Sequence, residues 1–130
     1  MDNEKLKMEQ RKNIVLEKSF GFAVRIVKLS QYLVEKKRER VLAKQVLRAG
    51  TSIGANVEEA DNASSRADFA HKISISLKEA KETHYWLRLL VETGYLERSM
   101  FESIIVDCNE LCKLLFAILK TTRLRKASAS

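Results

Sequence analysis

Apolar residues recur at steps of three and four over most of the chain, the spacing that places them on one face of an α-helix. Four segments carry this pattern, and charged or turn-forming residues separate them. The pattern predicts helices over about 12–35 and 41–61, a third that ends at Gly94 and a fourth that ends near Lys120. The third is the most regular, with alternating steps of four and three like a coiled-coil seam, at Phe69, Ile73, Ser76, Ala80, Thr83, Leu87 and Leu90.

The segments between these helices carry helix-start and helix-stop signals. Ser65 and Asp68 form a variant of the capping box, and Ser99 with Glu102 forms the standard one. Glycine is common just after the C-terminus of a helix, so Gly94 marks the end of the third helix. The chain has no proline and four glycines, too few for the turns of an all-β domain. We therefore predict an all-α fold, an antiparallel up-down-up-down four-helix bundle.

The chain length of 130 residues favours one domain with a single hydrophobic core. We expect the bundle to occupy residues 12–120, after an N-terminal extension over residues 1–11. Residues 121–130 lose the apolar periodicity and contain several basic side chains. We expect this segment to be a basic, disordered tail.

The first helix carries more apolar residues than one bundle core needs. One row consists of Leu16, Phe20, Ala23, Val27, Ser30 and Val34, and its neighbour consists of Phe22, Ile26, Leu29 and Leu33. We interpret the first row as the side that faces the core and the second as an additional apolar surface. A helix surface of this width predicts contact with another subunit.

Composition places the chain among helical proteins that work in water, with 45% hydrophobic and 32% charged residues. No segment has the apolar run of a signal peptide or the roughly 18 apolar residues of a membrane span. We therefore expect a cytoplasmic protein with no membrane role. Cys108 and Cys112 share a helix face but cannot easily close a disulfide without distortion, so we expect both to be reduced.

The second helix contains two glycines four residues apart, Gly50 and Gly54, within the stretch SIGANVEEA and the residues before it. Glycine inside a helix costs roughly 0.5–1 kcal/mol relative to alanine, so its presence needs a reason. Without a Cβ atom, a neighbouring helix can pack directly against the backbone. Close helix packing is our preferred interpretation, and a ligand lying on the same surface is the alternative.

Charged residues on the second and third helices face each other across their shared turn. In a hairpin centred near residue 63 or 64, Arg48 lies at the level of Glu79, Gln45 at the level of Glu82 and Glu59 at the level of Asp68. We predict that Arg48 pairs with Glu79 or Glu82 in a polar layer between the helices. Pairs of this kind set helix register more than they add stability.

The sequence offers little candidate chemistry. A di-metal bundle needs Glu-x-x-His on two helices, and neither His71 nor His84 follows a glutamate by three residues. His84 lies opposite Cys108, with Cys112 one turn away, but no fourth zinc ligand is evident and cysteines on an apolar stripe are usually core residues. No phosphate-binding loop, nucleophile elbow or metalloprotease motif is present. We predict no catalytic residue, no metal site and no cofactor.

Several segments together resemble a known family. They are Lys18-Ser19-Phe20, the run from Gln45 to Ala60 with its S-I-x-A-N-x-x-E core, Ser65 to Phe69, and Lys78 to Thr83. Over about residues 12–120 the chain resembles the bacterial four-helix-bundle family named for 23S ribosomal RNA intervening sequences. The accessory proteins of diversity-generating retroelements are distant relatives of that family.

The resemblance implies a homopentamer in which bundles assemble into a barrel, and an association with nucleic acid without catalysis. The family pattern maps onto a polar set that we extend with neighbouring residues of the predicted layer: Gln45, Arg48, Ser52, Asn56, Glu59, Glu79 and Glu82, with Phe69 also in the pattern. This chain departs from the pattern at Ala60, where many relatives have glycine, and at Glu79, where a small residue is common. Glu79 offers Arg48 a second carboxylate.

The formal net charge of +7 favours polyanionic partners such as RNA or DNA. The predicted topology brings both termini and the turn between the second and third helices to one end, which collects the larger excess of basic residues, including Arg66. There we predict the nucleic-acid-binding residues Lys5, Lys7, Arg11, Lys12, Lys120, Arg123, Arg125 and Lys126. The alternatives are a solvated basic surface and a protein-interaction adaptor with no nucleic-acid role.

Overall fold

The computed structural model describes the backbone of residues 2–129 and the side chains of residues 2–124. Four α-helices follow one another along the chain, α1 (Asn3–Lys37), α2 (Val41–Asp61), α3 (Arg66–Glu92) and α4 (Arg98–Ala129). No β-strand occurs between residues 2 and 129. The prediction of an all-α chain with four helices is confirmed.

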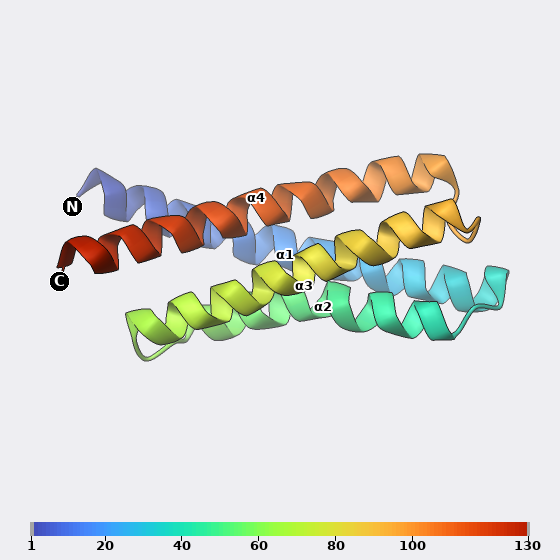
Figure 1. Ribbon diagram of the computed structural model, residues 1–130, viewed down its shortest axis with the longest axis horizontal. Helices are drawn as coiled ribbons and strands as arrows, with labels where there is room; N and C mark the ends of the chain where they lie inside the picture. Colours follow the sequence, from blue (N-terminus) through green and yellow to red (C-terminus); the bar gives the residue numbers. More distant parts are fainter. Residues whose placement is uncertain (1, 130) are drawn as a thin grey trace.

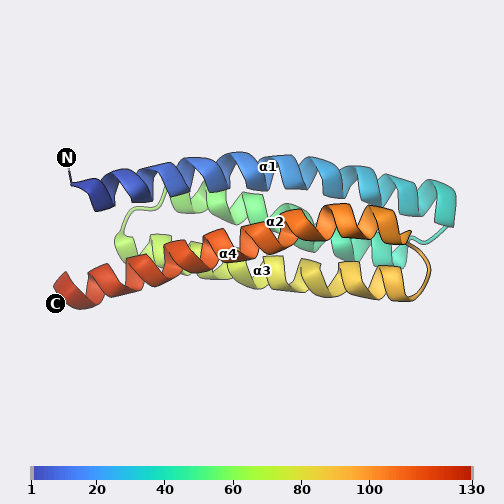
Figure 2. The same ribbon diagram turned by 90° about the horizontal axis from the view of Figure 1, so that it is seen from above.

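The helices lie side by side in an elongated molecule (Figures 1 and 2). Figure 1 shows the two termini and the α2–α3 connection toward one end, and the α1–α2 and α3–α4 connections at the other. Each helix packs against the next, and α4 packs against α1. Of these four neighbouring pairs, α1 and α4 are the least closely associated. No helix in the described part of the chain has the length and apolar character needed to cross a membrane.

The helix boundaries follow local signals that are visible in the sequence. The carboxylate of Asp2 accepts the backbone N–H of Glu4 at the start of α1, and the hydroxyl of Ser65 accepts the N–H of Asp68 at the start of α3, each at 3.0 Å. These side chains satisfy N–H groups that have no partner within the helix. Gly94 has φ +81°, a conformation that glycine adopts without strain. The cap predicted at Ser65 and the stop predicted at Gly94 are therefore confirmed.

The assignment of the two apolar rows on α1 is wrong. The row that we took for an additional surface, Phe22, Ile26, Leu29 and Leu33, is buried in the core. In the other row, Phe20 is 67% exposed and Val27 is 39% exposed. Two serines share the buried face because their hydroxyls have acceptors: Ser19 donates to the carbonyl of Leu16 at 3.3 Å, and Ser30 to that of Ala43 at 3.4 Å.

Both outer helices extend beyond the predicted boundaries. α1 begins at Asn3 instead of near Lys12, and the backbone of α4 continues as helix to Ala129 where we expected a disordered tail after Lys120. The two extensions contact each other, since Met8 and Thr122 are buried and Arg11 Nη1 donates to Thr121 Oγ1 at 3.3 Å. Lys, Arg, Leu and Ala are strong helix formers, and no glycine or proline interrupts either segment.

The two glycines of α2 lie against residues of α1. A Cβ atom on Gly50 would lie 2.7 Å from both Cγ1 and Cγ2 of Ile26, and one on Gly54 would lie 3.3 Å from the backbone oxygen of Ser19. Ile26 is fully buried and cannot move aside easily. Close helix packing is therefore the reason for both glycines.

We expect Gly50→Ala to lower the free energy of unfolding by about 1–2 kcal/mol, because overpacking against Ile26 outweighs the gain in helix propensity. The matched control is Gly21→Ala on α1, where an added Cβ would meet no atom within 4 Å. That variant should raise the free energy of unfolding by about 0.5–1 kcal/mol. Urea denaturation at one protein concentration measures both, and an equal gain in the two variants would contradict the close approach.

Candidate nucleic-acid interface

A polar pocket of about 450 Å³ lies at the end of the bundle where α2 and α3 connect. Three basic residues line it: Lys5 and Lys12 from α1, and Arg66, which begins α3. Asp61 is the acidic residue of the lining, and Ser64 and Ser65 add hydroxyl groups. The predicted residues Lys5 and Lys12 are therefore brought together with a third cation in one concave surface.

Two local features shape this pocket. The ammonium of Lys12 lies 4.8 Å from the ring centroid of Phe69, a cation–π contact that holds the side chain across α3. The same ammonium is 4.0 Å from the carboxylate of Glu9. The pocket also includes the N-terminus of α3, where unpaired N–H groups and the helix dipole favour negative charge. Asp68 in the first turn of α3 offsets part of that effect.

The other predicted basic residues surround this end without lining the pocket. Lys7, Lys120 and Arg123 are exposed. Arg11 is partly buried and donates a hydrogen bond to Thr121. The side chains of Arg125 and Lys126 lie outside the described residues. Arg66 was expected at this end but is absent from the predicted binding set. Its position directly after the capping Ser65 was the signal for its place at the pocket.

The predicted pairing of Arg48 across α2 and α3 is present. Arg48 donates to Glu79 at 3.2 Å and also to Glu82, so both carboxylates are partners. Glu82 accepts a further hydrogen bond from Trp86 Nε1 at 3.2 Å, which the four-residue spacing of the two permits but which we did not predict. The side chains of Arg48, Glu79 and Glu82 are 49%, 18% and 37% exposed, so the layer lies at the edge of the helix interface.

The remaining residues of the polar set also act within the helix pair. Asn56 donates to the carbonyl of Ser52 in its own helix at 2.8 Å, and Gln45 is partly buried. Glu59 pairs with Lys72 at 3.3 Å instead of facing Asp68.

A buried hydrogen bond joins the same two helices, from the hydroxyl of Ser76 to the carbonyl of Ile53 at 2.8 Å. The only sign of this hydrogen bond in the sequence was that Ser76 occupies an apolar position of the third helix. The polar set forms helix contacts and no concave chemical site.

The cysteine pair has unequal acidity. The buried thiol of Cys108 has two acceptors within reach, the carbonyl of Ala80 at 3.4 Å and the sulfur of Cys112. The hydrogen bond from Cys108 lowers the pKa of Cys112 to about 7, against the opposing effect of burial and with help from nearby Lys81. The same bond and burial raise the pKa of Cys108. Burial, followed by repulsion from Arg88, lowers the pKa of His84.

The described side chains contain no group of three or more His, Cys, Asp or Glu residues that could hold a metal ion. His84, Cys108 and Cys112 are therefore not brought together as the ligands of the zinc site that the sequence raised. The chemistry that the pair supports is that of a thiolate at Cys112.

We expect iodoacetamide to alkylate Cys112 with half-maximal rate near pH 7, because its thiolate forms at that pH, and to leave Cys108 unmodified. Peptide mass spectrometry distinguishes the two sites. Cys108→Ala should move the midpoint for Cys112 toward the ordinary pKa of a thiol. An unchanged midpoint in that variant would show that the hydrogen bond does not lower the pKa.

Comparison with known proteins supports a family assignment. The family described as "23S rRNA-intervening sequence protein" matches residues 11–117. A crystal structure described as a protein with unknown function from the S23 ribosomal protein family, from Bacteroides thetaiotaomicron VPI-5482, is 55% identical. The match covers 85% of this chain and 98% of that chain, with a TM-score of 0.83. No curated protein matches the sequence. On the extent of these matches, the chain belongs to the 23S rRNA-intervening sequence protein family.

Proposed function

We propose that this protein is a non-enzymatic, cytoplasmic scaffold that binds RNA or DNA non-specifically through the basic end of its bundle. The observation that carries the proposal is the pocket that Lys5, Lys12 and Arg66 share. Phosphate groups are the natural ligands of such a surface, because their charge is the same whatever the base sequence.

Unpaired cations strengthen this proposal. Among the described residues, Lys5, Lys7, Arg66, Lys120 and Arg123 have no carboxylate within ion-pair distance. A phosphate can therefore bind them without displacing a protein carboxylate. Asp61 of the lining, the nearby Glu9 and Asp68 in the first turn of α3 oppose an anion at the pocket. Binding of this kind releases counterions and depends steeply on salt.

We further propose that the up-down-up-down bundle assembles with copies of itself into a homopentamer. Large apolar side chains are exposed on several helices, among them Phe20, Val24 and Val27 on α1, Tyr85 on α3, and Val106 and Phe116 on α4. Contact between two different surfaces of identical subunits generates a ring when the rotation closes. The number five rests on the family resemblance. Such a ring would repeat the basic end once per subunit.

The test is fluorescence anisotropy of a labelled structured RNA with Lys5→Glu/Arg66→Glu/Arg123→Glu. We expect the affinity at low salt to fall at least about tenfold, because each reversal removes a phosphate contact. The matched control, Lys36→Glu/Lys37→Glu/Arg40→Glu, changes the net charge equally at the other end of the bundle. It should weaken binding by less than about threefold.

Equal losses in both variants would refute a localised interface. RNA binding that survives both high salt and the reversals would also contradict it. Absence of RNA binding altogether would favour the alternative, an adaptor that binds another protein through its exposed apolar residues. Light scattering with and without RNA tests the assembly separately, and a monomeric mass would exclude the ring.

A further inference from the structure

The polar pocket at the basic end is recessed into the bundle. Its lining comes from all four helices and from the α2–α3 connection. Met8, Ala60 and Thr122 belong to the lining, and all three are buried. The pocket therefore reaches below the exposed side chains of Lys5 and Arg66. A ligand that fills it must have a part narrow enough to enter between the helices.

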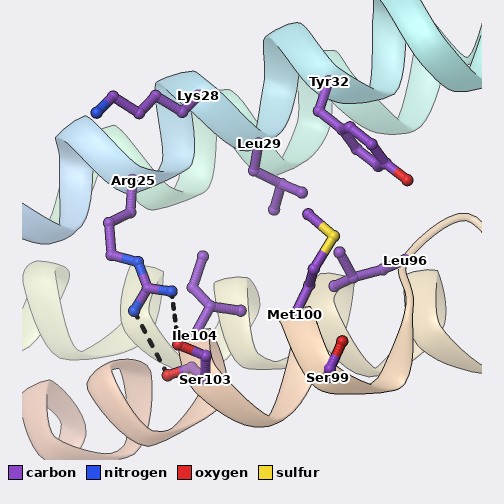
Figure 3. Close-up of a pocket in the computed structure, with 9 residues that line it drawn as sticks. All are labelled: Arg25, Lys28, Leu29, Tyr32, Leu96, Ser99, Met100, Ser103 and Ile104. Atoms are coloured by element: carbon purple, nitrogen blue, oxygen red, sulfur yellow. Dashed lines mark hydrogen bonds between the residues drawn. The ribbon is translucent and has the colours of Figure 1, made fainter.

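A second pocket, of about 420 Å³, lies between α1 and α4 (Figure 3) and has a different character. Leu29 and Leu96 in the lining of this α1/α4 pocket are buried core residues. Arg25 is paired with Asp107, and in Figure 3 the ammonium of Lys28 points away from the space between the helices. Of these two pockets, only the one at the basic end combines a recess with unpaired cations.

The charges of the basic-end pocket match those of a doubly charged anion. Three cations and one carboxylate, Asp61, line it, an excess of two positive charges. Glu9 and Asp68 lie outside the lining. The side chain of Glu9 is 63% exposed, so water screens its charge, and the helix dipole at the start of α3 offsets that of Asp68.

Phosphate groups of nucleic acids differ in charge according to their place in the chain. A phosphate that joins two nucleosides carries one negative charge. A phosphate monoester at the end of a chain carries about 1.5–2 negative charges at pH 7. The excess of positive charge in the pocket therefore attracts a terminal phosphate more strongly than an internal one.

A chain end also suits the shape of the pocket. An internal phosphate has a nucleoside on both sides, and both would have to leave the recess. A terminal phosphate has only one, so it can enter as far as the buried floor. The volume of about 450 Å³ lies within the range of small-ligand sites. On the basis of the nucleic-acid binding proposed above, we propose that this pocket binds the phosphate monoester at the end of a single-stranded RNA or DNA chain.

Two groups of residues have different roles in this proposal. The three cations of the pocket bind the terminal phosphate, and the hydroxyl of Ser64 adds a donor. The exposed side chains of Lys7, Lys120 and Arg123 lie outside the lining and contact phosphates further along the chain. Loss of a cation from the pocket should therefore change the preference for a phosphorylated end, and loss of a cation outside it should not.

The experiment uses the full-length protein and an internally labelled single-stranded RNA of about 12 nucleotides, followed by fluorescence anisotropy. Unlabelled competitors of the same sequence carry a 5′-phosphate, a 3′-phosphate or hydroxyls at both ends. A hydroxyl-ended chain two nucleotides longer matches the added charge. We expect a phosphate at one or both ends to raise the affinity about five- to tenfold over the hydroxyl-ended chain, and the longer chain to raise it less than about twofold.

Variants separate the pocket from the surrounding charge. Arg66→Gln should lower the preference for the phosphorylated chain at least about threefold, because the pocket loses a cation. The matched control is Lys120→Gln, an exposed lysine at the same end outside the pocket lining. It should weaken both chains equally and leave the preference unchanged. Ser64→Trp should remove the preference by filling the recess, with circular dichroism as the check on folding.

Equal affinity for the phosphorylated and hydroxyl-ended chains would overturn this inference and leave the proposed RNA binding in place. Absence of binding by every chain would refute both proposals. An equal loss of preference in Arg66→Gln and Lys120→Gln would assign the preference to general charge and exclude the pocket. Adenosine monophosphate that competes as well as the phosphorylated RNA would also overturn the inference, because the pocket would then be a site for a free nucleotide.

Discussion

The close approach of α1 and α2 at Gly50 is the contact on which the rest of the bundle depends. A buried isoleucine, Ile26, occupies the space that a Cβ atom of residue 50 would need. This contact fixes the rotation of α1, so that Phe22, Ile26 and Leu29 face inward and Phe20 and Val27 are left on the outside. α1 and α4 are less closely associated than the other neighbouring helix pairs, and a pocket of about 420 Å³ lies between them (Figure 3).

Much of the fold was predictable because it depends on local signals. Helix periodicity, the capping Ser65 and the stop at Gly94 act within a few residues, so the sequence is enough to identify them. The position of Arg48 opposite Glu79 could be predicted from the position of the turn alone. The buried row of α1 could not be predicted in this way, because both apolar rows have the same periodicity. Only the partner helix decides it, through Gly50 and Gly54. The helical ends of α1 and α4 likewise depend on contacts between segments that are distant in sequence, such as Arg11 with Thr121.

The candidate sites divide in the same way. The sequence predicted basic residues at one end, and Lys5, Lys12 and Arg66 do line one pocket. The pocket at that end depends on distances between helices, as does the contact of Lys12 with the Phe69 ring. The α1/α4 pocket had no signal in the sequence, because its lining residues read as ordinary core and surface positions. A pocket of this kind forms where two helices are further apart, and the sequence pattern does not indicate the distance between helices.

The residues of the family motif differ from those of the proposed nucleic-acid interface. The motif residues Arg48, Asn56 and Glu82 contact neighbouring helices or their own helix, so they specify the packing of the bundle. The family match covers residues 11–117, which includes Lys12 and Arg66 of the pocket but leaves Lys5, Lys7, Lys120 and Arg123 outside it. Phosphate affinity grows with the number of cations that reach the backbone. If the proposed binding holds, a relative with the same bundle and different ends would keep the fold and lose part of the affinity. In this interpretation the shared motif determines the scaffold, and the terminal extensions add to the cations that it offers.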